Sequence, residues 1–273
     1  MTIKQILQKY YSQKLALEQT EIDLLLALAL HKKIEYLYKN PEKELAISTK
    51  KAFQKLIRLR LANWPIAYLQ KKKDFFNLKF LVNQNTLIPR PESEMLIEEA
   101  LKFLKNKNNL NILDLGTGSG ALIITLAKNN QQQNYFATDI SKKALKVAKT
   151  NARKHKVKIN FTHSNLLNKV PQIKFDFIIA NLPYLTTAQM KEPSIKKEPR
   201  LALLSGQNGL DHYRALLKNL KKHLSKHYLI LLEIDPEQSA EIKKIISQYL
   251  SKAKIEIQKD LNSLDRLVKI SPK

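Results

Sequence analysis

"LDLGTGSGA", residues 113–121, contains three of the five glycines in a chain of 273 residues. Glycines clustered in so glycine-poor a sequence mark a turn that needs positive φ angles and that lets a ligand approach bare backbone. The apolar run at 110–116 is typical of a buried strand, and the segment after the glycines is typical of a helix. Gly116, Gly118 and Ala121 also satisfy the dinucleotide-binding pattern G-x-G-x-x-G/A. The loop therefore predicts a nucleotide-like cofactor at the end of a strand, and a tight turn without a ligand is the less favoured interpretation.

Strand and helix patterns alternate from residue 109 onward. The predicted strands are residues 110–116, 134–140, 158–164, 174–184, 227–234, 254–260 and 266–271. The predicted helices between them are residues 120–130, 141–156, 209–224 and 236–250. This alternation predicts an α/β fold, with a mostly parallel sheet and helices on both of its faces. The last two strands are close enough in sequence to form an antiparallel hairpin at the sheet edge.

The first third of the chain has a different organisation. Residues 2–62 have helical periodicity and few helix breakers, which predicts a small helical bundle, and Ser48 is a candidate cap for one of its helices. Residues 74–87 alternate in a way that predicts two short strands connected around Asn77. The next helix is expected to begin with Pro91 in its first turn.

The composition limits the class of protein. The chain is 44% apolar, which is enough for a well-packed core, and no apolar run reaches the length needed to span a membrane. The N-terminal residues lack a signal-peptide pattern, and the absence of cysteine excludes disulfides and thiolate metal sites, so a cytoplasmic protein is expected. The formal net charge of +24 suggests an acidic or RNA-associated partner, but only seven of the 48 basic residues are arginines, and they are scattered. We therefore interpret the charge mainly as compositional drift.

Two carboxylates narrow the choice of cofactor. Asp139 ends the second predicted strand, 23 residues after Gly116, where an acid can accept hydrogen bonds from ribose hydroxyls; this suits a dinucleotide and S-adenosylmethionine equally. Asp114 lies just before the glycine loop, where it would oppose a pyrophosphate at the helix N-terminus but is compatible with the cationic S-adenosylmethionine. An alternative role for Asp114 is to cap amides of the loop. Asn165 follows the third predicted strand, where its side chain could accept a hydrogen bond from an adenine amino group.

A second unusual stretch, "FDFIIANLPYLTT" at 175–187, runs from a buried strand directly into an amide, a proline and an aromatic ring. If this strand neighbours the one before the glycine loop, both strand ends lie at the ligand-binding edge of the sheet. The Asn181 side chain and the Leu182 carbonyl could then accept the two hydrogens of a planar nitrogen group. Pro183 would fix the turn, and the Tyr184 ring would stack on the plane of that group. Such a grip suits methyl transfer to an amide or amino nitrogen, whereas a strand-ending proline beside a packed tyrosine explains Asn181 less well.

"LDLGTGSGA" and "NLPYL" together resemble class I, Rossmann-like methyltransferases that modify amino or amide nitrogens. Four further stretches are similar to the PrmC/HemK family of protein-(glutamine-N5) methyltransferases. They are "WPIAYLQKKKDFFNLKF" (64–80), "LIPRPESEMLIEEAL" (87–101), "KEPRLALLSGQNGLDHYRAL" (197–216) and "IQKDLNSLDRLVKI" (257–270). The resemblance implies an S-adenosylmethionine-dependent enzyme that methylates the glutamine of the Gly-Gly-Gln motif in class I peptide chain release factors and so modulates translation termination.

The resemblance also implies roles for regions and residues. It implies a helical domain that helps to bind the release factor (residues 1–72), a β-hairpin linker (73–90) and a Rossmann-like methyltransferase domain (91–273). The donor-binding residues that it implies are Gly116, Thr117, Gly118, Ser119, Gly120, Asp139, Asn165, Leu166 and Asn181. Asp114 joins them because of its position before the loop. The glutamine-binding and catalytic residues that it implies are Asn181, Leu182, Pro183 and Tyr184.

The chain departs from the family pattern at several positions. Leu182 stands where the family has the first proline of Asn-Pro-Pro-Tyr. Asn165 and Leu166 stand where the family usually has an acid and an aromatic residue, and glycines expected near Lys71 and Asn77 are absent. These departures predict modest activity. They also motivate a non-enzymatic alternative, in which the chain is a decayed methyltransferase fold that is retained for binding or assembly.

The enzymatic alternative is an adenine-N6 methyltransferase acting on DNA or RNA. The same tetrapeptide can hold an exocyclic amino group, and the positive charge favours a nucleic-acid substrate. Neither a target-recognition domain nor an RNA-binding pattern is evident, however. We therefore expect the release factor to be the partner, with no requirement for nucleic acid or membrane.

Other polar residues have simpler interpretations. The histidines lack metal-binding spacing and are expected at the surface or at helix ends: His155, His163, His212, His223 and His227. Glu92 and Glu94 could face the donor or match the positive end of a helix. Arg200 could steer the substrate or pair with Glu198.

Overall fold

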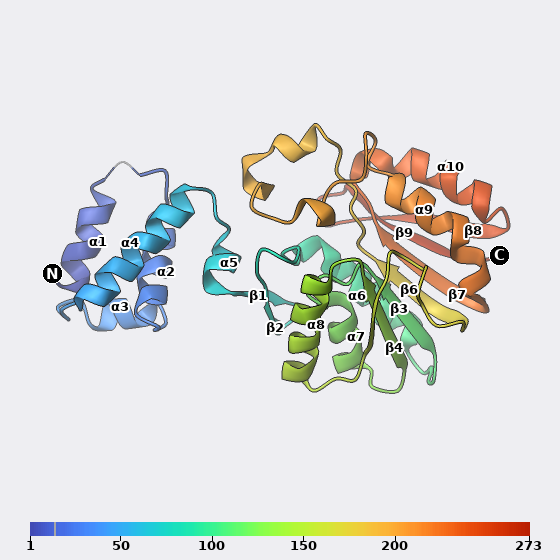
Figure 1. Ribbon diagram of the computed structural model, residues 1–273, viewed down its shortest axis with the longest axis horizontal. Coiled ribbons are helices and arrows are strands. Elements are labelled where there is room, and N and C mark those ends of the chain that lie inside the picture. Colours follow the sequence, from blue (N-terminus) through green and yellow to red (C-terminus); the bar gives the residue numbers. More distant parts are fainter. Residues whose placement is uncertain (14) are drawn as a thin grey trace. The chain divides into compact units, whose positions relative to one another are not determined.

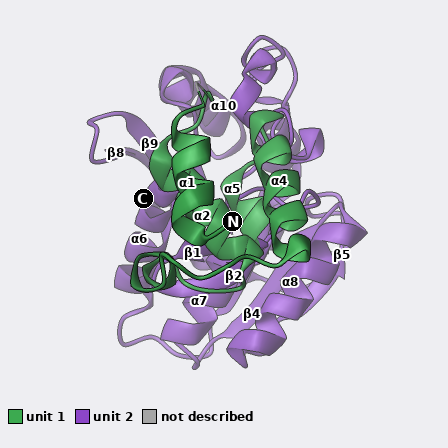
Figure 2. Ribbon diagram, turned by 90° about the vertical axis from the view of Figure 1, so that its left-hand side faces the viewer, with its two compact units in different colours: residues 1–70 green, residues 71–273 purple. Residues whose placement is uncertain are grey.

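The computed structural model describes residues 1–13 and 15–273. The chain forms two compact units, residues 1–70 and residues 71–273 (Figure 1, Figure 2). In the described part of the chain, no helix is long and apolar enough to cross a membrane.

The first unit is a helical bundle, as its periodicity predicts. Its helices are α1 (Ile3–Tyr11), α2 (Gln19–Ala29), α3 (Glu35–Lys39), α4 (Ile47–Leu61) and α5 (Ile66–Gln70). A capping box starts α1: the Thr2 hydroxyl accepts a hydrogen bond from the Gln5 amide, and the Gln5 side chain accepts one from the Thr2 amide. The helices bury an apolar cluster that includes Phe53. The predicted cap at Ser48 is wrong, because α4 already begins at Ile47 and Ser48 lies inside its first turn.

The second unit contains a two-stranded hairpin and a seven-stranded sheet. The hairpin strands are β1 (Lys72–Phe75) and β2 (Leu78–Leu81). The sheet strands are β3 (Asn111–Leu115), β4 (Asn134–Asp139), β5 (Asn160–His163), β6 (Phe175–Ala180), β7 (Leu224–Glu233), β8 (Ala253–Lys259) and β9 (Asp265–Pro272). Their order across the sheet is β5-β4-β3-β6-β7-β9-β8, with β9 antiparallel to both neighbours and every other pair parallel. The predicted parallel sheet with an antiparallel hairpin at one edge is confirmed.

Helices cover both faces of this sheet (Figure 1). They are α6 (Glu94–Leu104), α7 (Ala121–Asn129), α8 (Lys142–His155), α9 (Asp211–Leu220) and α10 (Ser239–Tyr249), with a short 3₁₀ turn, η1 (Pro91–Ser93), before α6. Side chains of α6, α7 and α8 share one apolar core with the sheet, and those of α9 and α10 share the other. The unit is therefore a three-layer α/β structure, the arrangement expected from its alternating pattern.

The chain reverses its direction across the sheet at β3. The strands β4 and β5 follow on one side of β3, and β6 and β7 lie on the other. The register pairs Leu115 with Ala180, so the loop after β3 and the residues after β6 leave the sheet side by side. Such a switch point, beyond the carboxyl ends of parallel strands, is where α/β sheets bind ligands.

Side-chain hydrogen bonds attach the hairpin to the helices of the α/β structure. Asn151, buried on α8, accepts from the Leu81 amide at 2.8 Å and donates to the Leu81 carbonyl at 3.0 Å. The same amide group donates to the Ser119 carbonyl of the glycine loop at 2.8 Å. Glu94 accepts from the Phe76 amide at the hairpin turn at 2.8 Å, so the structure gives this carboxylate a role in holding the hairpin.

Candidate active site

The glycine loop joins β3 to α7 through three residues with positive φ. The φ angles of Gly116, Gly118 and Gly120 are 72°, 56° and 83°. A Cβ at Gly116 would lie 3.1 Å from Leu182 Cδ2, and a Cβ at Gly120 would lie 2.6 Å from Ile124 Cδ1. Glycine is therefore favoured at these two positions by both conformation and space.

The end of β4 holds the loop in place. The Thr117 amide donates to the Thr138 carbonyl at 2.9 Å. Asp139 accepts from the Gly118 amide at 2.9 Å with Oδ2 and from the Ser141 amide at 2.7 Å with Oδ1. Burial raises the pKa of Asp139, and the two amide hydrogen bonds act against that rise. Each carboxylate oxygen can accept a further hydrogen bond, so Asp139 can both organise the loop and bind a ligand hydroxyl.

Asp114, at the end of β3, is a buried acid with one unused oxygen. Its Oδ2 accepts from the Thr117 hydroxyl at 2.6 Å, whereas Oδ1 is buried and accepts no hydrogen bond from the described residues. Burial raises the pKa of Asp114 to about 7, the Thr117 hydroxyl lowers it, and the nearby charge of Asp139 raises it. The backbone N–H of Ile123 also lowers this pKa, although it makes no hydrogen bond of normal length and angle to Oδ1. A buried carboxylate oxygen without a partner is costly, and a cationic ligand group would remove that cost.

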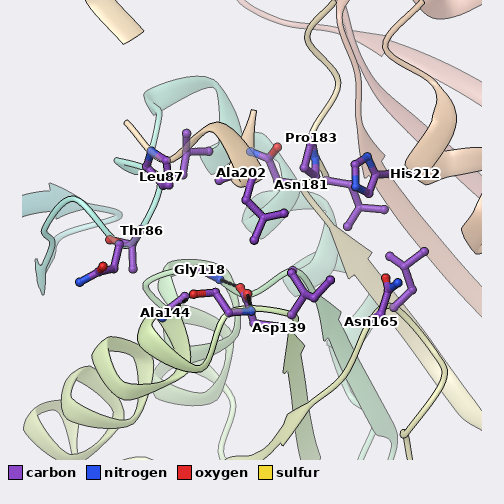
Figure 3. A pocket seen from close by; sticks show the side chains of 18 of the residues that line it. Thr86, Leu87, Gly118, Asp139, Ala144, Asn165, Asn181, Pro183, Ala202 and His212 are labelled. Carbon is purple, nitrogen blue, oxygen red and sulfur yellow. Dashed lines mark hydrogen bonds between the residues drawn. The ribbon is translucent and has the colours of Figure 1, made fainter. Parts of the chain in front are cut away.

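Three hollows meet at Asn181. The first hollow is lined by residues that include Leu87, Gly116, Gly118, Asp139, Asn165, Leu166, Asn181, Leu182, Pro183 and His212 (Figure 3). The second hollow is lined by residues that include Leu87, Ser93, Asp114, Gly116, Thr117, Gly118, Ser119 and Asn181. The third hollow is lined by Leu87, Arg90, Asn181, Leu182, Tyr184, Leu185, Ile195, Ala202 and Leu203. Because Asn181 lines all three, groups bound in different hollows can meet beside its side chain.

Side chains from other elements hold the polar groups of the tetrapeptide at 181–184. Asn181 Nδ2 donates to Ser93 Oγ at 3.1 Å, and the Tyr184 hydroxyl donates to Glu233 Oε1 at 3.1 Å. Burial and the adjacent charge of Glu233 raise the pKa of the Tyr184 phenol, so it stays protonated. Asn181 Oδ1 accepts no hydrogen bond within the described part of the chain, so it remains available to a ligand.

The leucine in the tetrapeptide is restrained by packing. The Leu182 side chain is 2% exposed and belongs to the apolar core beneath α9 and α10. Its Cδ2 also lies against Gly116, so the tetrapeptide and the glycine loop are in contact. The carbonyl of Tyr184 accepts from Gln238 Nε2 at 2.8 Å. Burial and this hydrogen bond hold the turn that a proline ring would otherwise stiffen.

The predicted site residues lie close together, but they divide among the hollows. Those that line the second hollow and not the first are Asp114, Thr117 and Ser119. Tyr184 lines the third hollow, and Gly120 lines none of the three, so its contribution is to the turn. Asn165 and Leu166, after β5, line the first hollow, and Leu166 has a left-handed φ of 46°. The loop and the tetrapeptide are therefore near enough for one small molecule to contact both.

Ser93 and Glu233 are not predicted from the sequence. Ser93 is in the 3₁₀ turn before α6, and Glu233 is the last residue of β7; both are buried. The Ser93 hydroxyl donates to Glu233 Oε2, which joins the two hydrogen bonds of the tetrapeptide into one network. The sequence does contain one signal that could have marked Glu233 as a candidate site residue. Like Asp114 and Asp139, it is an acid at the carboxyl end of an apolar strand.

His212 and His223 lie at helix ends, as expected, but neither is a simple surface residue. His212 is in the first turn of α9 but also lines the first hollow, where its Nδ1 is 2.8 Å from Ser205 Oγ. Burial lowers the pKa of His212, which favours the neutral ring at neutral pH. His223 is buried. Within residues 1–13 and 15–273, no group of three or more histidine, aspartate or glutamate side chains is placed to hold a metal ion.

Glu198 pairs with a different arginine from the one expected. Its carboxylate, 2% exposed, forms an ion pair with Arg90 and accepts from the Ile88 amide at 3.0 Å. Arg90 lines the third hollow. The expected pairing of Glu198 with Arg200 is therefore replaced by a contact that fixes one wall of that hollow.

Comparison with known proteins gives two family matches. Residues 93–198 match the family model described as the methyltransferase small domain, and residues 4–70 match the model described as the PrmC N-terminal domain. Among solved structures, ribosomal protein L11 methylase from Lactobacillus delbrueckii subsp. bulgaricus is similar, with a TM-score of 0.51 and 23% identity over 67% of this chain and 80% of that chain. This last likeness concerns the fold alone.

Curated relatives cover nearly the whole chain. A release factor glutamine methyltransferase from Coxiella burnetii is 34% identical over 98% of this chain and 98% of that protein. A bifunctional methyltransferase from Rickettsia prowazekii is 36% identical over 99% of this chain, but the match covers only 57% of that protein. The chain thus spans little more than half the length of the bifunctional relatives.

Proposed function

The chain belongs to the release factor glutamine methyltransferase family, and on that premise we propose that it methylates the side-chain amide nitrogen of the glutamine in the Gly-Gly-Gln motif of class I peptide chain release factors. The proposed methyl donor is S-adenosylmethionine. We further propose that the helical unit, which includes the PrmC N-terminal domain match at 4–70, contributes to binding of the release factor. The observation that carries the proposal is the meeting of three hollows at Asn181.

The first and second hollows have the groups that the donor requires. Asp139 can accept hydrogen bonds from the ribose hydroxyls, and Asn165 and Leu166 line the part of the first hollow that would receive the adenine. The unpaired Oδ1 of Asp114 in the second hollow suits the donor's ammonium group. When bound, the donor supplies an electrophilic methyl group on a sulfonium. The Asp114 carboxylate beside the start of α7 would oppose a pyrophosphate at that helix N-terminus, which agrees with this choice of cofactor.

The third hollow and the tetrapeptide can hold a planar carboxamide. Asn181 Oδ1 and the Leu182 carbonyl are candidate acceptors for the two amide hydrogens, and the Tyr184 ring lines the same hollow. An amide nitrogen is a weak nucleophile because its lone pair is delocalised into the carbonyl. Accepting both hydrogens orients the nitrogen and increases its electron density. The remaining rate advantage would come from alignment of the nitrogen with the S–CH₃ bond of the donor. The nitrogen becomes acidic once it carries the extra group, so its proton can pass to water without a strong base.

The test is transfer of labelled methyl from S-adenosylmethionine to a purified class I release factor and to its Gln→Ala variant in the Gly-Gly-Gln motif. Label is expected on the native factor and not on the variant. Asn181→Ala is expected to lower the rate by about 100-fold, because positioning of the amide is lost. Asn262→Ala, at the exposed turn between β8 and β9, is the matched control and should leave the rate unchanged. Equal label on both release factors would exclude the proposed substrate.

One observation favours the adenine alternative. The exposed face of α8 carries Lys142, Lys143, Lys146 and Lys149, and the helix has no acidic residue, so phosphates would be attracted to it. Labelled donor offered with DNA or RNA, at low and at physiological salt, tests this alternative. Incorporation into nucleic acid without incorporation into the release factor would replace the proposal. Failure to bind S-adenosylmethionine in calorimetry would instead favour a non-enzymatic role.

A further inference from the structure

Glu233 is a buried carboxylate beside the tetrapeptide. It is the last residue of β7, where it pairs with Leu267 of β9. Because Ala180 on β6 pairs with Leu232, Asn181 follows β6 beside Glu233. Glu233 is 1% exposed. Burying a carboxylate costs several kcal/mol of folding free energy unless hydrogen-bond donors surround it. The donors around Glu233 therefore indicate which groups it holds in place.

Those donors connect Glu233 to both polar side chains of the tetrapeptide. The Tyr184 hydroxyl donates directly to Oε1 at 3.1 Å. The Ser93 hydroxyl donates to Oε2, and Ser93 Oγ in turn lies 3.1 Å from Asn181 Nδ2. Burial raises the pKa of Glu233, and the two hydroxyl hydrogen bonds and the charge of Arg266 act against that rise. One acid therefore restrains the phenol and, through a serine, the amide.

The direction of these hydrogen bonds decides how the Asn181 amide is oriented. Ser93 gives its single hydroxyl hydrogen to Glu233 Oε2, and a carboxylate, which only accepts hydrogen bonds, keeps the serine in that donor role. Ser93 Oγ can then only accept from Asn181, which requires the NH₂ group of Asn181 to face Ser93 and Oδ1 to face away. Without the carboxylate, Ser93 could donate to Asn181 Oδ1, and the amide could turn around. The acceptor that the substrate nitrogen needs would then be replaced by a donor.

We propose that Glu233 is a positioning residue for the acceptor amide: it fixes the orientation of the Asn181 carboxamide through Ser93 and the position of the Tyr184 ring through its hydroxyl. The proposal rests on the proposed methyl transfer to glutamine. It predicts a role different from simple core packing, because the shape of the side chain matters less than its inability to donate a hydrogen bond.

The first test separates charge from shape. Glu233→Gln keeps the shape but can donate to Ser93 or Tyr184, and it is expected to lower kcat for release-factor methylation by about 10- to 100-fold. Its KM for the release factor and its affinity for S-adenosylhomocysteine should change by less than about twofold, since neither contact is removed. Ser93→Ala should give a similar loss, Ser93→Thr should retain most of the activity, and the double variant Glu233→Gln/Ser93→Ala should be no worse than the poorer single variant. Glu237→Gln, an exposed neighbour, is the control.

Normal kcat in Glu233→Gln, or a loss shared equally by donor binding and thermal stability, would overturn the inference. A second readout does not depend on the reaction. In protein labelled with ¹⁵N-asparagine and bound to S-adenosylhomocysteine, the side-chain NH₂ signals of Asn181, identified by their absence in Asn181→Asp, should shift in Glu233→Gln and in Ser93→Ala but not in Glu237→Gln. If the native protein fails to methylate the release factor while these shifts appear, the proposed function fails and the positioning role stands. Unchanged Asn181 signals in both variants would refute the positioning role, whatever the substrate.

Discussion

Asp114 is the residue at which donor binding and folding stability are expected to oppose each other. Its carboxylate is buried, its Oδ1 has no hydrogen-bond partner among the described residues, and its pKa is raised to about 7. If the donor's ammonium group binds this oxygen, only the ionised carboxylate binds it well. The ionised fraction is about one half at pH 7 and about 3% at pH 5.5, so the association constant should fall roughly fifteenfold over that range.

Ionisation of Asp114 has the opposite effect on folding stability from the one it has on donor binding. Because the folded-state pKa of Asp114 lies above the unfolded value, the acid contributes stability at pH values below the unfolded pKa, and that contribution is lost as the pH rises through about 7. At pH 7 the loss has an upper limit of about 4 kcal/mol. Asp114→Asn avoids this loss and can still accept from the Thr117 hydroxyl. We expect the variant to be more stable to urea than the native protein at pH 7, and to bind the donor more weakly.

The assay is calorimetric titration with S-adenosylhomocysteine between pH 5.5 and pH 7, a range in which the α-amino group of the ligand stays protonated. Asp139 and His212 line the neighbouring hollow and have shifted pKa values, but both remain in Asp114→Asn. The difference between the two pH profiles therefore reports Asp114 together with its charge interaction with Asp139. A native profile that is flat, or a variant profile with the same slope, would refute an ammonium contact at this residue. A variant less stable than the native protein at pH 7 would refute the assignment of a costly buried charge.

Three further outcomes test the geometry. In urea, Gly120→Ala should lower the free energy of unfolding by about 2 kcal/mol more than Gly118→Ala. Both positions have positive φ, but only a Cβ at residue 120 would lie 2.6 Å from another side chain. Equal losses of stability would contradict the packing argument. Lys71→Gly should stabilise the protein by about 1 kcal/mol, because lysine at φ 56° is strained. Asn77→Gly, at φ 60°, should gain less stability because asparagine tolerates this conformation. Urea unfolding compares the two variants, and a larger gain at Asn77 would contradict the reasoning. Arg90→Ala should cost about 1–3 kcal/mol, because a buried carboxylate loses its cation while the partly exposed arginine limits the loss; a cost below about 0.5 kcal/mol by the same method would show that water replaces the arginine.

The sequence predicts the parts of the site that are encoded locally. An apolar run followed by three glycines specifies the β3–α7 turn. The apolar run before Asn181 specifies β6, although the predicted strand 174–184 continues past the end of β6 at Ala180. Their adjacency is predicted only on the condition that the two strands are neighbours, and the strand order of the structure meets that condition. Thus both halves of the candidate site, and the sheet that joins them, could be predicted before the structure was known.

Ser93 and Glu233 could not be predicted in the same way. They are 140 residues apart in the sequence, and Ser93 is 88 residues from Asn181, so no local pattern connects them. The local position of each residue already accounts for its polar side chain, because Ser93 lies at the start of a helix and Glu233 at the end of a strand. Neither residue therefore stands out as part of a site. The orientation of an amide depends on which hydrogen bonds its neighbours have already made, and that is a property of tertiary structure.

The distribution of buried acids indicates what kind of ligand the site accepts. Among the described residues, the buried acids of the second unit are Asp114, Asp139, Glu198 and Glu233, and all four lie at or beside the three hollows. The chain as a whole has a formal charge of +24, so this group of buried acids stands in contrast to a strongly basic protein. Burying them costs stability, and of the four only Asp139 has a position that a dinucleotide would also use. A ligand that carries a sulfonium and an ammonium would offset that cost, whereas the phosphates of a nucleic acid would be attracted to the lysine-rich surface and repelled from the hollows themselves. The same charge arrangement therefore favours S-adenosylmethionine as the donor and an uncharged carboxamide as the acceptor.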